Sequence, residues 1–141
     1  EAALAESAPV DAPPRLGAAE GRPYIDHSRH IGAFDPAFPE YTITVDAAHA
    51  QGEVTFPLVF EGPPGVVHGG VLATFFDCVI QHHNCDLGVA GKTATLHLEY
   101  RRPTPVGAAL RFTIDRAVGS QRITSRAELF EAERLLCAAT A

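Results

Sequence analysis

The sequence predicts a single α+β domain in which a sheet wraps one long helix. Three observations carry this prediction. An apolar segment with helical spacing lies in the middle of the chain, two strand-like segments precede it, and four follow it. Strands that accompany one helix in this order are expected to fold around it. The length of 141 residues suits one domain that buries a real core.

The first two strands are expected before the helix. Residues 41–45 alternate as a half-buried strand, and a turn around 49–52 is expected to lead into a second strand over 53–60. The loop 61–65 cannot be regular structure, because its two prolines lack backbone donors. After the helix, alternating segments predict strands over 93–100 and 110–115, and two further strands are expected over 123–130 and 135–141.

The helix is expected from Gly69 to about Asn84, with Gly88 as a stop signal. Its apolar residues are spaced for a helix and cover most of its circumference, so we expect it to be buried rather than to lie on the surface. These residues are Val71, Leu72, Phe75, Phe76, Val79 and Ile80. Residues 1–22 are rich in Ala, Pro, Gly and Glu without periodicity, which predicts a flexible arm before one domain over 23–141.

Composition excludes several function classes. The net charge of −6 disfavours a nucleic-acid partner. No apolar run approaches the roughly 20 residues that a membrane helix needs, and residues 1–21 do not have the pattern of a signal peptide. Three cysteines without paired spacing favour a reducing compartment, so we expect a cytoplasmic protein.

The segment His68-Gly69-Gly70 opens the helix and carries the strongest chemical signal. The first N–H groups of a helix have no partner within it, and glycine lets a ligand approach them closely. Such amides can polarise a carbonyl as an oxyanion hole. Asp77 then lies in the middle of an apolar helix, where a carboxylate is costly unless it has a partner or a function.

Gly69 and Asp77 are eight residues apart, which is about 12 Å along a helix axis. One carbonyl group therefore cannot touch both in a single subunit. Two such helices packed antiparallel about a two-fold axis would bring Asp77 of one to the start of the other. The motif predicts a composite site at a dimer interface.

This segment, with Asp77 and the downstream pattern Thr93 to Tyr100 followed by Arg101-Arg102-Pro103, resembles the hot-dog thioesterase superfamily in its PaaI-like and acyl-CoA thioesterase 13-like branch. The resemblance covers roughly residues 40–141. It implies an antiparallel sheet wrapped around a central helix, and a dimer that can pair into a tetramer. It also implies hydrolysis of acyl-CoA or a related acyl thioester, without a metal or a redox cofactor, since coenzyme A is part of the substrate.

The resemblance also implies roles for single residues. Gly69 would supply the oxyanion N–H, and Asp77 would act as nucleophile or general base. His68 would shape the site, and Thr93 would orient the attacking water. One position departs from the pattern, because Gly62 stands where relatives often carry asparagine.

Four further residues are candidates for substrate binding. Gly70 would leave room for the ligand, and Phe76 would line an acyl pocket, although aromatics on a buried helix are usually core. Arg101 and Arg102 would meet coenzyme A phosphates, although solvated charges at a strand end are an equal expectation.

Three alternatives stay open at this point. A metal site at 81–86 is disfavoured, because its adjacent histidines point in different directions and no regular Cys/His spacing completes a ligand set. A hot-dog hydratase or dehydratase would use other histidine–acid motifs. A catalytically silent acyl-CoA-binding protein of the same fold is favoured by Gly62.

Overall fold

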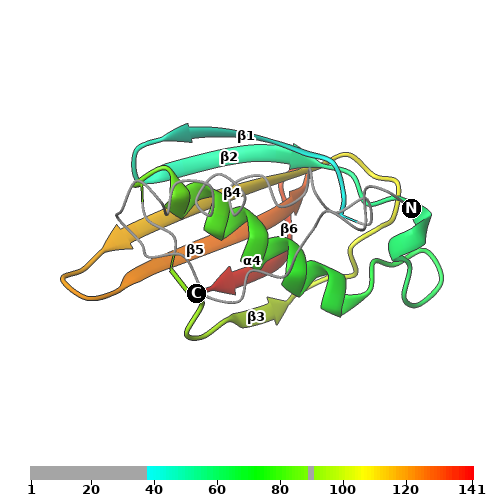
Figure 1. Cartoon of the computed structure of the whole chain (residues 1–141). Helices are drawn as coiled ribbons and strands as arrows, with labels where there is room; N and C mark the ends of the chain where they lie inside the picture. The colour runs from blue at the N-terminus through cyan, green and yellow to red at the C-terminus, as the bar shows by residue number, and fades with distance from the viewer. Residues whose placement is uncertain (1–37, 89–90) are drawn as a thin grey trace, which may run out of the picture.

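The computed structural model describes residues 38–88 and 91–141; the predicted arm at 1–22 lies outside them. Two strands precede a long helix and four strands follow it, as the sequence predicted (Figure 1). The elements are β1 (Tyr41–Asp46), β2 (His49–Val54), the short 3-10 helix η2 (Leu58–Phe60), α4 (Gly69–Cys85), β3 (His97–Tyr100), β4 (Leu110–Val118), β5 (Ile123–Glu131) and β6 (Arg134–Thr140).

The six strands form one antiparallel sheet in the order β1-β2-β4-β5-β6-β3. The sheet curves around α4, which lies along its concave face (Figure 1). This confirms the predicted α+β architecture. Strand β3 lies at the end of the sheet and pairs with β6 alone. No helix in the described part of the chain is long and apolar enough to cross a membrane.

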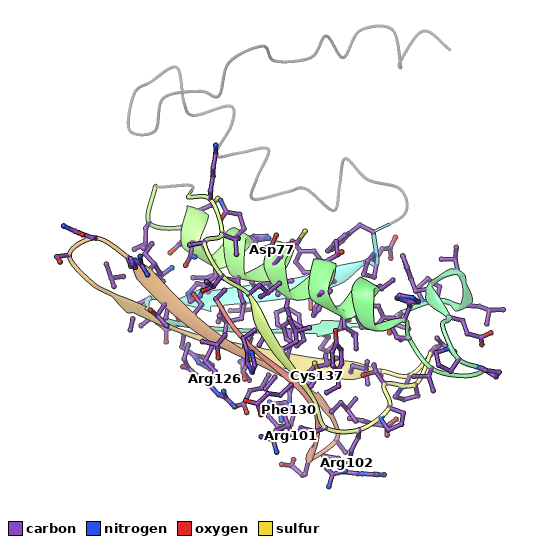
Figure 2. All side chains as sticks on the ribbon, turned by 90° about the horizontal axis from the view of Figure 1, so that it is seen from below. Asp77, Arg101, Arg102, Arg126, Phe130 and Cys137 are labelled. Atoms are coloured by element: carbon purple, nitrogen blue, oxygen red, sulfur yellow. The ribbon has the colours of Figure 1, made fainter. Side chains whose placement is uncertain are left out.

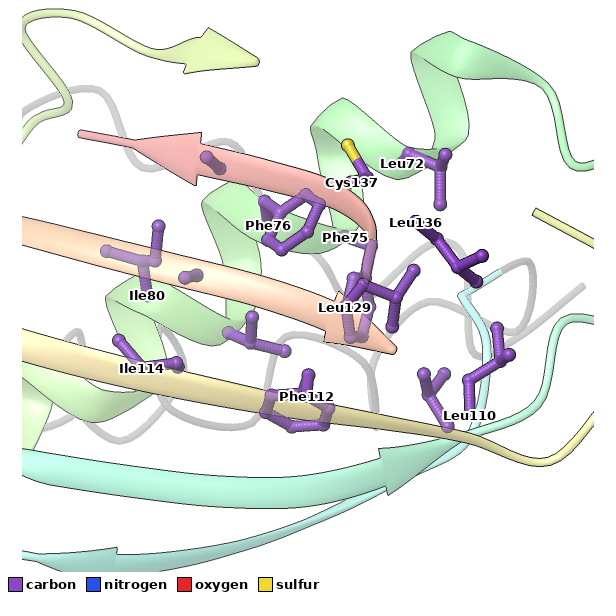
Figure 3. Close-up of a cluster of buried hydrophobic side chains, with 14 of the residues drawn as sticks. Leu72, Phe75, Phe76, Ile80, Leu110, Phe112, Ile114, Leu129, Leu136 and Cys137 are labelled. Carbon is purple, nitrogen blue, oxygen red and sulfur yellow. The ribbon is translucent and has the colours of Figure 1, made fainter. Parts of the chain in front are cut away.

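The core lies between α4 and the central strands (Figure 3). Phe75 is at its centre, and its ring centroid lies 5.3 Å from those of both Phe56 and Phe112 in edge-to-face geometry. Phe76, Val79 and the other buried positions of the helix follow the spacing that the sequence predicted. Removing one large buried ring of this kind costs about 3–5 kcal/mol, so this face of the helix is fixed firmly on the sheet.

The helix is not buried all round, contrary to expectation. Thr74 is exposed, while Asp77, Cys78, Gln81 and His82 are half-buried. These residues interrupt the apolar pattern on the side of α4 that faces away from the sheet. A single chain therefore covers one face of the helix and leaves the side with Asp77 accessible.

The β1–β2 hairpin differs from the prediction. Its turn is the two-residue loop Ala47-Ala48, with Ala47 at a φ of 50°, and β2 begins at His49 rather than at residue 53. Gly52 lies inside β2, where a Cβ would come 2.6 Å from the ring of Phe112 and 1.8 Å from the carbonyl oxygen of Thr42. A glycine is thus needed at position 52 for close packing against Phe112 and Thr42, and not for a turn.

The end of α4 is held by Arg116 of β4. Its guanidinium donates to the carbonyl oxygens of His83, at 2.6 Å, and Ala47, at 2.7 Å, and a cation is favoured at a helix C-terminus. Nε2 of the fully buried His83 donates to the same Ala47 oxygen at 2.9 Å. Nδ1 then has no partner among the described residues, and burial lowers the pKa of His83, so the ring is neutral.

Candidate active site

The start of α4 is organised by His68. Nδ1 of this residue accepts a hydrogen bond of 3.0 Å from the N–H of Gly70 and so caps the helix. Its carbonyl oxygen accepts from the N–H groups of Val71 and Leu72, at 3.0 and 3.2 Å. The backbone amides of residues 70–72 therefore all donate hydrogen bonds to His68. Because Nδ1 is an acceptor here, the neutral ring carries its proton on Nε2.

Gly69 is the exception among the first amides of the helix. No described residue accepts a hydrogen bond from its N–H. Its carbonyl oxygen accepts a hydrogen bond of 2.9 Å from the hydroxyl of Tyr100, at the end of β3. A Cβ at Gly69 would lie 3.3 Å from that hydroxyl, so the backbone is approached closely there. Gly69 thus offers the one free donor at the positive end of the helix dipole within the described chain.

Asp77 is two turns further along the helix, and its partner comes from the segment before β3. The hydroxyl of Thr93 donates to Oδ1 of Asp77 at 2.5 Å. No described residue donates to Oδ2. One carboxylate oxygen is therefore held in place while the other stays open to a water molecule or a substrate. The two residues, 16 positions apart in sequence, form a pair on the accessible side of α4.

The amide of Gly69 and the carboxylate of Asp77 are separated by eight residues of continuous α-helix. At 1.5 Å per residue this is about 12 Å along the axis. The structure of one chain thus holds two half-sites, an unpaired donor at the start of the helix and an oriented carboxylate in its middle. Neither half alone has both groups that acyl transfer requires.

The loop before the helix explains the glycine at position 62. A Cβ at Gly62 would lie 3.0 Å from Cα of His68 and 3.2 Å from its Cβ. The loop is anchored by hydrogen bonds from His68 N–H to the Phe60 carbonyl and from Val67 N–H to the Thr104 carbonyl. His68 therefore occupies the space in which any side chain at position 62 would begin.

The other candidates for substrate binding are distributed unevenly. Gly70 is exposed at the start of the helix. Phe76 is fully buried in the core, which favours its packing role. Arg101 pairs with Glu99, and Arg102 donates to the carbonyl oxygen of Leu135 at 3.0 Å.

Figure 2 shows Asp77 on the helix and both arginines at the far side of the sheet, so a single chain does not bring them together. Tyr100 is the contact that the sequence prediction missed, because it was assigned only to the alternating pattern of a strand. Strand β3 is in fact four residues long, and Thr93 lies before it. The adjacent histidines 82 and 83 diverge, since His82 Nδ1 meets the hydroxyl of Tyr41 at 2.7 Å and His83 meets Ala47.

No group of three His, Cys, Asp or Glu residues is placed to hold a metal ion within 38–88 and 91–141. The clusters around His68 and around Asp77 use backbone amides, an imidazole, hydroxyls and one carboxylate. These are the groups of acid–base and oxyanion chemistry.

No protein-family model matches the chain, but solved structures do. One thioesterase superfamily protein is 32% identical with a TM-score of 0.65, over 71% of this chain and 53% of its own. The chain thus spans about half the length of that relative. A phenylacetic acid degradation-related protein of Ralstonia eutropha JMP134 is 24% identical with a TM-score of 0.67, over 84% and 96%. The E. coli PaaI protein is 17% identical with a TM-score of 0.69, over 86% and 90%.

These likenesses define the class of the fold. The single helix and its six-stranded antiparallel wrap are the hot-dog fold of thioesterase superfamily proteins. The structural neighbours include PaaI and thioesterase superfamily member 2 of Mus musculus, so the resemblance to the PaaI-like hot-dog proteins, inferred from the helix motif, is confirmed at the level of the fold.

Proposed function

We propose that this protein hydrolyses acyl thioesters of coenzyme A, or of a related pantetheine carrier, to a free acid and a thiol. One observation supports this above the others. His68 engages the amides of residues 70–72 and leaves the N–H of Gly69 unpaired at the start of α4. An unpaired amide at a helix N-terminus is a donor placed in advance for the negative charge that develops on a thioester oxygen.

In the proposed reaction the thioester oxygen accepts a hydrogen bond from Gly69, and Asp77 acts on the carbonyl carbon. Asp77 either attacks directly, forming an anhydride that water then hydrolyses, or removes a proton from an attacking water. Both routes break the carbon–sulfur bond and release the thiol. Thr93 holds Oδ1 of Asp77, so Oδ2 is the oxygen that reacts. The chemistry asks for no metal and no redox cofactor, and coenzyme A enters only with the substrate.

The active unit in this proposal is a dimer. The two half-sites lie about 12 Å apart on one helix and cannot act on one carbonyl together. Antiparallel packing of two α4 helices about a two-fold axis unites Gly69 of one chain with Asp77 of the other. The accessible, half-buried side of α4 that carries Asp77 and Gln81 is the surface available for this contact.

Two proteins with the same fold support the choice of substrate carrier. A hypothetical thioesterase protein of Streptococcus pneumoniae TIGR4, 19% identical to this chain, was solved with coenzyme A. A Streptococcus mutans UA159 protein, 14% identical, was solved with acetyl-CoA. Acetyl-CoA carries the thioester on which the proposed chemistry acts, and coenzyme A is the thiol that the reaction would release.

The direct test is release of free thiol from a panel of acyl-CoA substrates by wild type and by Asp77→Asn. We expect the variant to lower kcat by about 10²- to 10⁴-fold, because the acid–base or nucleophilic group is lost. Asparagine preserves the shape and can still meet Thr93, so circular dichroism and sedimentation should be unchanged. Equal thiol release by the two proteins excludes the proposed role, and tight binding without turnover in wild type indicates a binding protein instead.

A mixing experiment tests the composite site. Chains with Asp77→Asn are combined with chains with Gly69→Pro, which removes the N–H. Each variant alone should be nearly inactive. A mixed dimer contains one site with both groups intact, so random pairing should restore about a quarter of wild-type activity. No recovery after confirmed subunit exchange contradicts a site shared between chains.

A further inference from the structure

A cavity lies beside Thr93 of the Asp77–Thr93 pair, and the chemistry above does not use it. Its volume is about 600 Å³, which is within the range of small-molecule sites. Thr93 lines it at one end, and Gln81 and Asn84, on the next two turns of α4, continue its wall. The β4–β5 hairpin closes the other end with Arg122. The cavity therefore begins at Thr93, the hydrogen-bond partner of Asp77, and extends toward the end of the helix.

The lining of this cavity carries positive charge. Its described residues include Lys92 and Arg122, and no Asp or Glu side chain. Neither cation forms an ion pair with any carboxylate in the described chain. Oδ1 of Asn84 is buried without a hydrogen-bond partner among the described residues, and an amide can turn to present either its oxygen or its NH₂ group.

The helix end itself does not account for these cations. The last carbonyl oxygens of α4 already have donors, since His83 accepts from Arg116 and from the N–H of Asp86. Asn84 and Cys85 accept from the N–H groups of residues 87 and 88. Two exposed cations and an unpaired amide thus line a cavity to which the described residues contribute no negative side chain. Two cations beside one cavity are complementary to a carboxylate.

We propose that this cavity receives the far end of the acyl group and selects acyl chains that end in a carboxylate. The proposal rests on the proposed thioester hydrolysis and names its substrate class. The ω-carboxylate would lie between Lys92 and Arg122, while Gln81 and Asn84 would donate to it or to polar groups along the chain. Ile80 supplies apolar contact for the methylene carbons.

Length distinguishes this carboxylate from the phosphates of coenzyme A. Seven residues separate Asp77 from Asn84, which is about 10 Å along the helix. A short dicarboxylic chain spans that distance from the thioester carbon. The phosphates lie beyond the whole pantetheine arm, which is longer than the cavity. A cation near Asn84 is therefore within reach of the acyl end and not of the phosphates.

The test uses two six-carbon substrates that differ only at the acyl end, adipoyl-CoA and hexanoyl-CoA. We expect wild type to prefer adipoyl-CoA in kcat/KM. The double variant Lys92→Gln, Arg122→Gln should lose about tenfold or more on adipoyl-CoA, the worth of a hydrogen-bonded charge contact, and less than twofold on hexanoyl-CoA. Arg122→Lys should retain most of the preference. Arg134→Gln, an exposed charge change at the start of β6, is the matched control and should alter neither substrate.

Two further experiments distinguish a contact with the acyl carboxylate from a contact with the coenzyme A phosphates. N-acetylcysteamine thioesters of the same two acids lack all phosphates, so a carboxylate contact keeps the preference with them, and a phosphate contact abolishes the effect of the variants. Calorimetry with the non-hydrolysable S-(5-carboxypentyl)-CoA and S-hexyl-CoA measures selection without turnover. If wild type hydrolyses neither thioester, the proposed activity is overturned. The acyl-end proposal is then still tested by calorimetry, which measures whether the cavity prefers the carboxylate-ended ligand. Equal losses on both substrates, a loss confined to coenzyme A esters, or altered dimer dissociation without altered selectivity each overturn the acyl-end proposal.

Discussion

The hydroxyl of Thr93 donates a hydrogen bond of 2.5 Å to Oδ1 of Asp77, joining the segment before β3 to the middle of α4. Thr93 is exposed and Asp77 is half-buried, so this bond does not serve the core. It fixes the rotamer of a carboxylate on the accessible side of the helix. We interpret Thr93 as a positioning residue for Asp77.

Thr93→Val should therefore lower kcat by about 10- to 100-fold, the worth of a hydrogen bond to a charged group. Thr93→Ser keeps the hydroxyl and should retain most of the activity. Steady-state kinetics with one acyl-CoA and urea unfolding of each variant separate the two contributions. Equal activity of the valine and serine variants contradicts a positioning role.

Gly69→Pro tests the unpaired amide. Proline is tolerated at the first helical position, and His68 already has the extended conformation that a following proline requires, with φ of −60° and ψ of 133°. We expect kcat to fall by about 10²- to 10³-fold, as for loss of an oxyanion donor. Gly69→Ala is the matched control, because it adds the same Cβ near Tyr100 and keeps the N–H. If both substitutions cost the same, the cause is the contact with Tyr100 and not the donor.

Gly62→Ala should destabilise the protein by about 1–3 kcal/mol, because the new Cβ would lie 3.0 Å from Cα of His68. Since His68 caps the helix, kcat should fall as well. Gly91→Ala is the control, because no atom of the described residues lies within 4 Å of a Cβ placed there. Urea midpoints of the two variants give the comparison. A Gly62 variant as stable as the Gly91 variant would show that the loop adapts without cost.

Stability should decrease as the pH falls below the ordinary histidine value of about 6.5. Burial lowers the pKa of His83 in the folded chain, so the unfolded chain binds the proton more strongly. The stabilisation is complete at pH values above the pKa that His83 has in the unfolded chain. It is lost as the pH falls toward the lower pKa that His83 has in the folded chain. Nearby charges on Arg116, Asp86 and His49 modulate this pKa.

His83→Gln removes the titration and keeps a donor for the carbonyl oxygen of Ala47. We expect its urea midpoint to vary less between pH 7.5 and pH 5 than that of wild type. Identical pH dependence in the two proteins assigns the effect to other groups.

Much of the fold follows from local patterns. The helix begins at Gly69 as predicted and ends one residue past the expected Asn84, because the apolar spacing and the Gly88 stop signal act locally. Strands β4 and β5 likewise follow their alternation, and β6 lies where a strand was expected although four consecutive residues in it are buried. The β1–β2 hairpin does not, because Ala47 turns the chain and Gly52 serves the packing of Phe112. That packing depends on tertiary structure.

The site was predictable to a similar degree. His68, Gly69 and Asp77 occur at or on one helix, so the distance between them along its axis follows from their spacing in the sequence. The bonds from Thr93 to Asp77 and from Tyr100 to Gly69 depend on how the chain around β3 runs beside α4, and the pairing of β3 with β6 sets that register. Long-range pairing of this kind leaves no local signal.

Because His68 caps the start of α4, Gly69 is left as the one unpaired backbone donor there among the described residues. With the three following amides already engaged, no neighbouring backbone donor can replace Gly69 if its geometry shifts. Small displacements of the 61–68 loop should therefore lower kcat sharply and leave the affinity for the substrate nearly constant. Variation among acyl substrates would then have to arise at the other end of the ligand, where side chains can change without disturbing the helix.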